Sequence, residues 1–187
     1  MNTNLFLALL VPMVGSSWVF SESSQASNRT CQGSLGQITV ENLSVANNGT
    51  CRLNGTRVKG NLFVGSNAAL IASELRLSGN LQAKSARQVD ITFFSNISGN
   101  IEIQRSRSVN IAATKIEGNL ELTSNLGNIR VFGNQVQGNV EVIQSSGSVS
   151  IHNNRIDGNL ICKGNQPQPR GQSNVVKGNK ENQCSRL

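Results

Sequence analysis

Three glutamates at one repeat position are the strongest candidates for chemistry in this sequence. Glu102, Glu121 and Glu141 follow one another at nearly constant intervals, each two positions after a Gly-Asn pair. In a stacked repeat their carboxylates would form a column, about one strand spacing apart. Such a column could raise a carboxylate pKa, bind a cation such as Ca²⁺, or supply an acid and a base. A solvated column balanced by neighbouring Lys and Arg side chains is the simpler interpretation.

A second repeat position carries mostly positive charge. It lies three residues before the Gly of each pair and holds, in order, Arg57, Arg76, Asn96, Lys115, Gln135, Arg155 and Val175. The cations could contact an anionic polymer along the stack, or they could offset the glutamates. The binding residues expected here are therefore Arg57, Arg76, Lys115 and Arg155. No nucleic-acid-binding motif accompanies them, and we expect no nucleic-acid partner.

The other candidate residues give less support to an enzymatic function. A polysaccharide lyase or hydrolase could use the glutamate column with Arg105 or Arg107 nearby. Enzymes of this kind generally need clustered acids in a groove built from long loops, whereas the segments between repeats here are short. His152 is the only histidine and no CxxC pair occurs, so neither a metal site nor a cofactor is expected.

Aromatic side chains are scarce. Residues 27–187 contain no Trp or Tyr and only four Phe, at positions 63, 93, 94 and 132. Sugar-binding faces usually present exposed aromatic platforms with a polar handle, so this composition argues against an extensive one. Phe93 and Phe94 form one apolar step, of which one side chain is expected to enter the core.

The candidate columns depend on a repeat that is marked by Gly-Asn pairs. The pairs recur at a nearly constant spacing, at Gly60-Asn61, Gly79-Asn80, Gly99-Asn100, Gly118-Asn119, Gly138-Asn139, Gly158-Asn159 and Gly178-Asn179. A unit of roughly twenty residues cannot bury an apolar face alone and must stack on its copies. Within each copy apolar and polar residues alternate, as in Val140-Glu141-Val142, which is typical of half-buried strands. We predict an all-β fold, a single-stranded parallel β-helix of about seven coils.

The Gly-Asn pairs are predicted to form corners of this β-helix. Gly and Asn adopt positive φ angles most readily, and a tight corner between strands requires such angles. The side chains of seven asparagines are also predicted to stack as an amide ladder: Asn61, Asn80, Asn100, Asn119, Asn139, Asn159 and Asn179. Upstream, Glu41-Asn42 takes the place of a Gly-Asn pair, which indicates a degenerate first coil.

The N-terminal residues indicate export. The apolar stretch from Leu5 to Phe20 is short and interrupted by Pro12 and Gly15, so it predicts a signal peptide rather than a membrane-spanning helix. The predicted organisation is a signal peptide at 1–26, an N-terminal cap with the degenerate coil at 27–55, β-helix repeats at 56–173 and a C-terminal cap at 174–187. The expected location is secreted, periplasmic or at the cell surface.

Four cysteines, Cys31, Cys51, Cys162 and Cys184, are predicted to cap the ends of the stack. Disulfides are the default in an exported chain, and four cysteines allow three connectivities. The two local bridges, Cys31–Cys51 and Cys162–Cys184, fit a solenoid best because the other pairings join opposite ends. Each local bridge closes a loop of about twenty residues and would contribute about 3 kcal/mol.

The C-terminal stretch carries a resemblance to known proteins. Residues 158–165, GNLICKGN, precede Pro167 and Pro169, and the stretch NVVKGNKENQC then ends at Cys184. With its signal peptide, four cysteines and Val-x-Gly-Asn repeats, the chain resembles small secreted bacterial β-helix proteins of unknown function. The resemblance implies the fold and secretion, and it implies no catalytic residues. A more distant likeness is to bactofilin-like β-helix polymers, which associate through open ends.

These observations predict a non-enzymatic exported module of the cell surface or extracellular space, expected to be monomeric. The formal net charge is +7, and removal of residues 1–26 with their single acid would raise it to +8. This charge favours an anionic envelope polymer or polysaccharide as partner, with another surface protein as the alternative. Contact with a membrane is expected only through the signal segment before cleavage. A polysaccharide-active enzyme and a self-assembling envelope scaffold are the other functions that fit.

Overall fold

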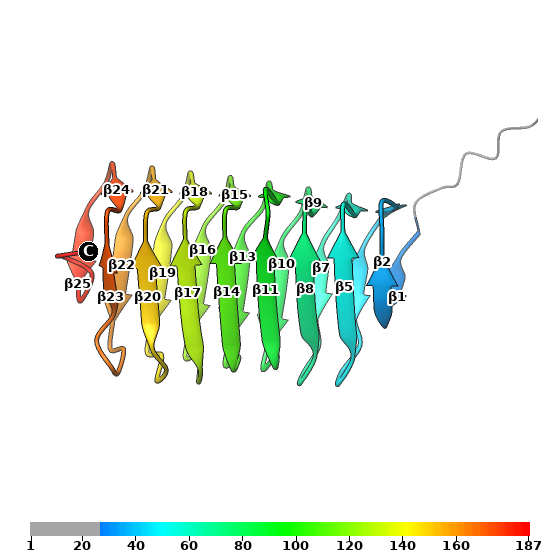
Figure 1. The fold of residues 1–187 in the computed structure, drawn as a ribbon, viewed down its shortest axis with the longest axis horizontal. Helices are drawn as coiled ribbons and strands as arrows, with labels where there is room; N and C mark the ends of the chain where they lie inside the picture. Colours follow the sequence, from blue (N-terminus) through cyan, green and yellow to red (C-terminus); the bar gives the residue numbers. More distant parts are fainter. Residues whose placement is uncertain (1–26) are drawn as a thin grey trace, which may run out of the picture.

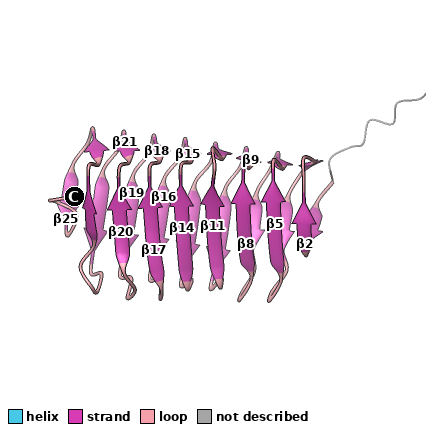
Figure 2. Ribbon diagram, in the orientation of Figure 1, coloured by secondary structure: helices cyan, strands magenta, loops and turns pink. Residues whose placement is uncertain are grey.

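The computed structural model describes residues 27–187, and the predicted signal peptide lies outside the described residues. The described chain is all-β and winds through about eight turns that stack along one axis (Figure 1). Strands joined by short loops make up every turn, as Figure 2 shows. The predicted parallel β-helix is confirmed, with one turn more than expected because residues 29–40 also form strands. Nothing in residues 27–187 forms a helix with the length and apolar character that a membrane span needs.

Each complete turn contributes one strand to each of three parallel sheets, here called sheets A, B and C, and one further strand adds to sheet A at the C-terminal end. Sheet A contains β1 (Arg29–Cys31), β4 (Leu43–Val45), β7 (Leu62–Val64), β10 (Leu81–Lys84), β13 (Ile101–Gln104), β16 (Leu120–Thr123), β19 (Val140–Ile143), β22 (Leu160–Lys163) and β25 (Lys180–Asn182). Sheet B contains β2 (Gly33–Leu35), β5 (Thr50–Asn54), β8 (Ala69–Ser73), β11 (Gln88–Thr92), β14 (Ser108–Ala112), β17 (Asn128–Phe132), β20 (Val149–His152) and β23 (Arg170–Gln172). Sheet C contains β3 (Thr39–Val40), β6 (Arg57–Val58), β9 (Arg76–Leu77), β12 (Asn96–Ile97), β15 (Lys115–Ile116), β18 (Gln135–Val136), β21 (Arg155–Ile156) and β24 (Val175–Val176).

The core is a single apolar column inside the three sheets. In β16, Leu120 and Leu122 are fully buried, whereas Glu121 and Thr123 point outward. Period-two alternation therefore sends one face of every strand inward, as the sequence pattern predicts. Each strand of sheet C except the last, β24, supplies one buried residue: Val40, Val58, Leu77, Ile97, Ile116, Val136 and Ile156. Because the inward side chains stack on copies of themselves, each turn buries its apolar face against its two neighbours.

The Gly-Asn pairs lie at the corners between sheets C and A, as predicted, but not for the predicted reason. No Gly or Asn of these pairs has a positive φ angle. A Cβ atom at Gly79 would instead collide with the carbonyl oxygen of Gly60 and with Oδ1 of Asn61 on the preceding turn. Glycine is required here because successive corners pack too closely for a side chain.

The asparagines of the pairs do form a ladder, with a different bonding pattern from the one expected. Each side-chain Oδ1 accepts a hydrogen bond from the backbone N–H of the equivalent Asn one turn later, at 2.7–2.8 Å. The bond from Asn61 N to Asn42 Oδ1 starts the series. The degenerate pair Glu41-Asn42 thus occupies the repeat position that the sequence indicated.

Positive φ angles occur at the other two corners. Between sheets B and C they are found at Gly55, Glu74, Phe94, Ala113, Gly133, Asn153 and Ser173. Between sheets A and B they are found at residues such as Ser85, Arg105, Ser124, Gln144 and Gly164. Most of these residues carry a Cβ, and the left-handed conformation then costs roughly 1–2 kcal/mol per residue. The inter-turn hydrogen bonds of the stack must offset that strain.

A second asparagine ladder lies inside the solenoid, immediately after the corner between sheets B and C. Asn134, Asn154 and Asn174 are each at most 6% exposed. Asn154 Oδ1 accepts hydrogen bonds from both N and Nδ2 of Asn134, each at 3.0 Å. Asn154 Nδ2 donates in turn to Asn174 Oδ1 at 2.9 Å and to the carbonyl oxygen of Val131 at 3.0 Å. In this interior column successive asparagines are joined by amide-to-amide bonds, whereas the asparagines of the Gly-Asn pairs are joined by side-chain-to-backbone bonds.

Both predicted disulfides form, and they lie near the two ends of the stack. Cys31 and Cys51 face the interior with Cα atoms 5.6 Å apart, and Cys162 and Cys184 do so with Cα atoms 5.1 Å apart. The terminal turns have a neighbour on one side only, so their burial is incomplete. Cross-links at these positions therefore stabilise the turns that stacking stabilises least. Two buried disulfides are also typical of proteins from an oxidising compartment.

Candidate functional site

Sheet C brings the predicted cations into one outward-facing column. Each of its strands except β24 exposes the first residue and buries the second. The strand register pairs Arg57 with Arg76, Arg76 with Asn96, Asn96 with Lys115, Lys115 with Gln135, and Gln135 with Arg155. We call this series the sheet C column. Neighbouring members are about 4.8 Å apart, because each occupies the same place on adjacent strands.

Acids flank two of the four cations. Glu117 Oε1 lies 2.8 Å from Lys115 Nζ, and both side chains are well exposed. The hydrogen bond from Lys115, together with its charge, holds the pKa of Glu117 below its ordinary value. Asp157 Oδ1 lies 3.9 Å from Arg155 Nε and 2.9 Å from Lys177 Nζ, but it accepts no well-aligned hydrogen bond within residues 27–187. Exposed pairs of this kind contribute little to stability.

The first two cations of the column have no such partner among residues 27–187. No acidic oxygen lies within 4 Å of Arg57 or Arg76 in this part of the chain. Both guanidinium-bearing residues line an open cleft of about 280 Å³ that also contains Glu74. Lys59, also exposed, follows Arg57 on the same turn. Positive charge on sheet C is therefore least compensated at the N-terminal end.

The predicted acidic column also forms, on the outer face of sheet A. Glu102 pairs with Glu121, and Glu121 pairs with Glu141, on β13, β16 and β19. Partial burial raises the pKa of Glu121, and the charges of Glu141 and Glu102 raise it further. Glu102 accepts a hydrogen bond from Gln104 Nε2 on its own strand. The three carboxylates thus repel one another, and the middle one is most affected.

The surroundings of the acidic column give it no obvious reactive partner. Arg105 and Arg107 are exposed in the corner after β13, and within residues 27–187 neither forms an ion pair with the glutamates. Glu102 lines an open cavity of about 300 Å³, together with Phe63 and Gln82. Across the described turns, no group of three or more His, Cys, Asp and Glu side chains is arranged to hold a metal ion.

Phe93 and Phe94 contradict the expectation that one of them enters the core. Their side chains are 65% and 85% exposed, and both have positive φ angles. Their repeat is one residue longer than the repeat on either side, and it has two left-handed residues at a corner where the others have one. The extra residue therefore bulges outward. Buried Ser95 anchors the bulge, since its hydroxyl donates to the carbonyl oxygen of Thr92 at 2.8 Å.

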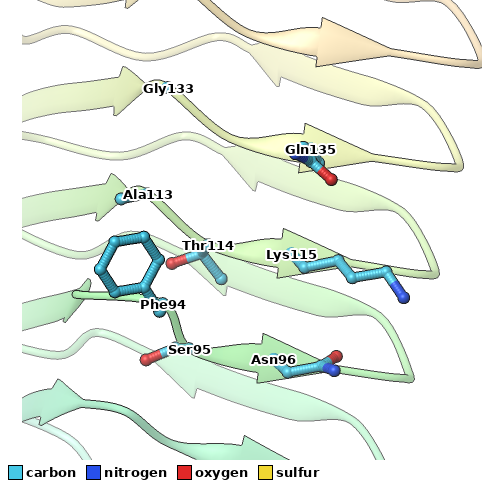
Figure 3. A pocket seen from close by; sticks show the side chains of 8 residues that line it. All are labelled: Phe94, Ser95, Asn96, Ala113, Thr114, Lys115, Gly133 and Gln135. Atoms are coloured by element: carbon cyan, nitrogen blue, oxygen red, sulfur yellow. The ribbon is translucent and has the colours of Figure 1, made fainter.

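The bulge forms one wall of a cleft that reaches the sheet C column. The cleft has a volume of about 330 Å³ and is lined by Phe94, Ser95, Asn96, Ala113, Thr114, Lys115, Gly133 and Gln135. Figure 3 shows the ring of Phe94 at the corner, with Asn96, Lys115 and Gln135 one above another on successive strands. Ala113 and Gly133 occupy the corner position of the next two turns. Because these residues are small, they leave open space beside the ring.

Sequence reasoning located both charged columns but missed this cleft and the interior asparagines. Asn96 and Gln135 were expected only as interruptions in the basic column, and the bulge was not expected. The interior ladder did have a signal, because the residue four positions before each repeat Gly is polar in most copies: Thr56, Ser95, Thr114, Asn134, Asn154 and Asn174. That preference predicts a buried, hydrogen-bonding position.

Comparison of the chain with protein-family models, with curated proteins and with solved structures found no match.

Proposed function

We propose that this chain is an exported, non-enzymatic binding module that presents the sheet C face of a rigid β-helix to an anionic polymer of a cell envelope or extracellular matrix. The sheet C column carries the proposal, because it places four cations in register along one face. A polymer lying parallel to the stack can contact all of them at once. A linear array of weak contacts then yields useful affinity without a deep pocket.

Two further features support the proposal. Three acids, Glu102, Glu121 and Glu141, stack in register on sheet A, so this acidic column lies on another sheet than the cations of the sheet C column. The two disulfides fit a protein exported to an oxidising compartment, whether secreted, periplasmic or attached to a cell surface. Because a disulfide cross-links the stack near each end, the array of charged residues is nearly fixed, and binding does not have to order the protein surface.

The test is retention of the disulfide-bonded protein on immobilised polygalacturonate over a salt series. Binding should weaken as salt rises, because ions screen exposed charges. The double variant Arg57→Gln/Arg76→Gln should lose most retention, since neither arginine forms an ion pair with an acid of residues 27–187. Arg52→Gln/Arg130→Gln removes the same charge from the outer face of sheet B and is the matched control. Equal loss in both variants, or no retention at low salt, would contradict the proposal.

A further inference from the structure

The sheet C column alternates between a cation and an amide from its second member onward. The order is Arg76, Asn96, Lys115, Gln135 and Arg155, one residue per turn and all in register. Successive cations are therefore two turns apart, or about 9.6 Å at one strand spacing per turn. The amide groups of Asn96 and Gln135 are exposed and make no side-chain hydrogen bonds within residues 27–187. They are free to bind hydroxyl or amide groups of a ligand.

The apolar wall of the cleft lies beside the first of these amides. Phe94 precedes Asn96 by two residues, and its ring is almost fully exposed at the corner (Figure 3). The positive φ angle of Phe94 is shared by the corner residues of the other turns, so the exposed ring, and not the backbone conformation, distinguishes this corner. Exposed apolar surface of this size is also costly in water. An aromatic face next to two planar amides and an ammonium group suits a sugar ring, which has an apolar face and polar edges.

We propose that the sheet C column and the Phe94 cleft together bind an acidic polysaccharide in which anionic and neutral sugars alternate. This inference rests on the proposed function and names the class of polymer. A sugar ring in an extended chain advances by roughly one strand spacing, so an anionic group on every second ring matches cations on every second turn. Neutral rings face Asn96 and Gln135, and Phe94 stacks on the ring bound at Asn96. The cleft volume of about 330 Å³ lies within the range of small-molecule pockets.

Glu117 and Asp157, the acids beside Lys115 and Arg155, compete with the proposed polymer for these cations. Glu117 binds the ammonium group that the polymer must also bind, and Asp157 lies beside Arg155. Bound polymer competes with both acids for the cations. Removing them should strengthen binding, provided that the polymer occupies this column. Polymer bound to another face would respond to Glu117→Gln only through the small change in net charge.

The test compares three probes of equal charge number: an alternating uronate–N-acetylhexosamine oligosaccharide, oligogalacturonate with one charge per ring, and oligophosphate. We expect the alternating probe to bind most tightly. Phe94→Ala should weaken that probe about tenfold, a change typical of one aromatic anchor, and should leave oligophosphate binding unchanged. Glu117→Gln should strengthen the alternating probe. Phe63→Ala removes an exposed ring from sheet A and is the matched control.

Each outcome separates this inference from the proposed function. If all three probes bind equally and Phe94→Ala changes none of them, the binding module stands and the alternating polysaccharide is wrong. If no probe binds at low salt, both are wrong. If the alternating probe binds best but Phe94→Ala and Phe63→Ala weaken it equally, the assignment to the cleft is wrong. Circular dichroism checks that each variant keeps its β-sheet signal, and the exposed position of Phe94 favours normal folding.

Discussion

The interior asparagine ladder makes a strong prediction about stability, which Asn154→Ala tests. Asn154 is 1% exposed, and its Oδ1 is the acceptor for both N and Nδ2 of Asn134. Its Nδ2 donates to Asn174 and to the carbonyl oxygens of Val131 and His152. Truncation to alanine removes all of these bonds at a site that water cannot easily reach. The backbone N–H of Asn134 then has no acceptor.

The magnitude follows from the groups that lose their partners. A buried donor or acceptor without a partner costs about 1–3 kcal/mol. Asn134 loses the acceptor of its backbone N–H and one of the two acceptors of Nδ2, which keeps its bond to the carbonyl oxygen of Ile111. We therefore expect Asn154→Ala to lower the free energy of unfolding by about 3 kcal/mol. For a fold of this size that corresponds to a fall in Tm of roughly 6–12 °C. Asn154→Ser should lose less, because a hydroxyl can accept the same backbone bond, as Ser95 does from Leu75 N.

Urea unfolding followed by circular dichroism measures the effect. Asn128→Ala is the matched control, because Asn128 is exposed and its side chain makes no hydrogen bond within residues 27–187. The urea dependence of the free energy must agree between variants, since a solenoid can lose cooperativity when one turn is weakened. A loss for Asn154→Ala within about 0.5 kcal/mol of the control, the usual scatter of surface substitutions, would refute the reasoning.

Charge repulsion, cross-linking and close packing each give one further prediction. Because the native pKa of Glu121 is raised, the contribution of Glu121 to stability is greatest below the ordinary pKa of 4.5 and declines as pH rises through the native value. Glu121→Gln should therefore stabilise the fold at pH 7 by a few tenths of a kcal/mol and should not stabilise it at pH 3. An equal effect at both pH values would argue against charge repulsion. Replacing Cys162 and Cys184 by serine should lower stability by about 3 kcal/mol in thermal melts without reductant, and the difference from the parent protein should shrink once reductant opens the parent's bridges. Gly99→Ala should lower the free energy of unfolding by roughly 1–3 kcal/mol or more, the effect of overpacking, because the added Cβ would collide with the preceding corner. Gly36→Ala is the control, because Gly36 has open space around it and the substitution should not lower stability. Equal denaturation midpoints for the two variants would contradict the close-packing argument.

The repeat period was sufficient to predict the architecture. The nearly constant spacing of the Gly-Asn pairs, with an apolar residue two positions before each Gly, places Val58, Ile97 and Ile156 in one buried column, and the structure confirms them. The same period predicted the register of the charged columns, because equivalent residues of a solenoid must stack. It also favoured the two local disulfides, because a regular stack keeps its ends apart.

The bonding at the corners could not be predicted from residue types. Asparagine is compatible with positive φ angles, with side-chain bonds to backbone groups and with amide ladders. At the Gly-Asn corners it accepts backbone N–H groups in an ordinary conformation, whereas at Asn153 it adopts a positive φ angle. At Asn154, one residue later, it lies inside the ladder. The choice depends on the packing distance between neighbouring turns, which is a property of the assembled stack.

The sequence by itself thus determined the solenoid, its inward and outward faces and the columns of charge, because all of these depend on a period that is written along the chain. Only the tertiary structure decided which cations are paired with acids, and that Phe93 and Phe94 both point into solvent beside Asn96. The physical reason is that ion pairs and clefts form through side-chain directions that the local backbone sets, often between residues a whole repeat apart. One inserted residue at a corner changes those directions without changing the repeat that surrounds it.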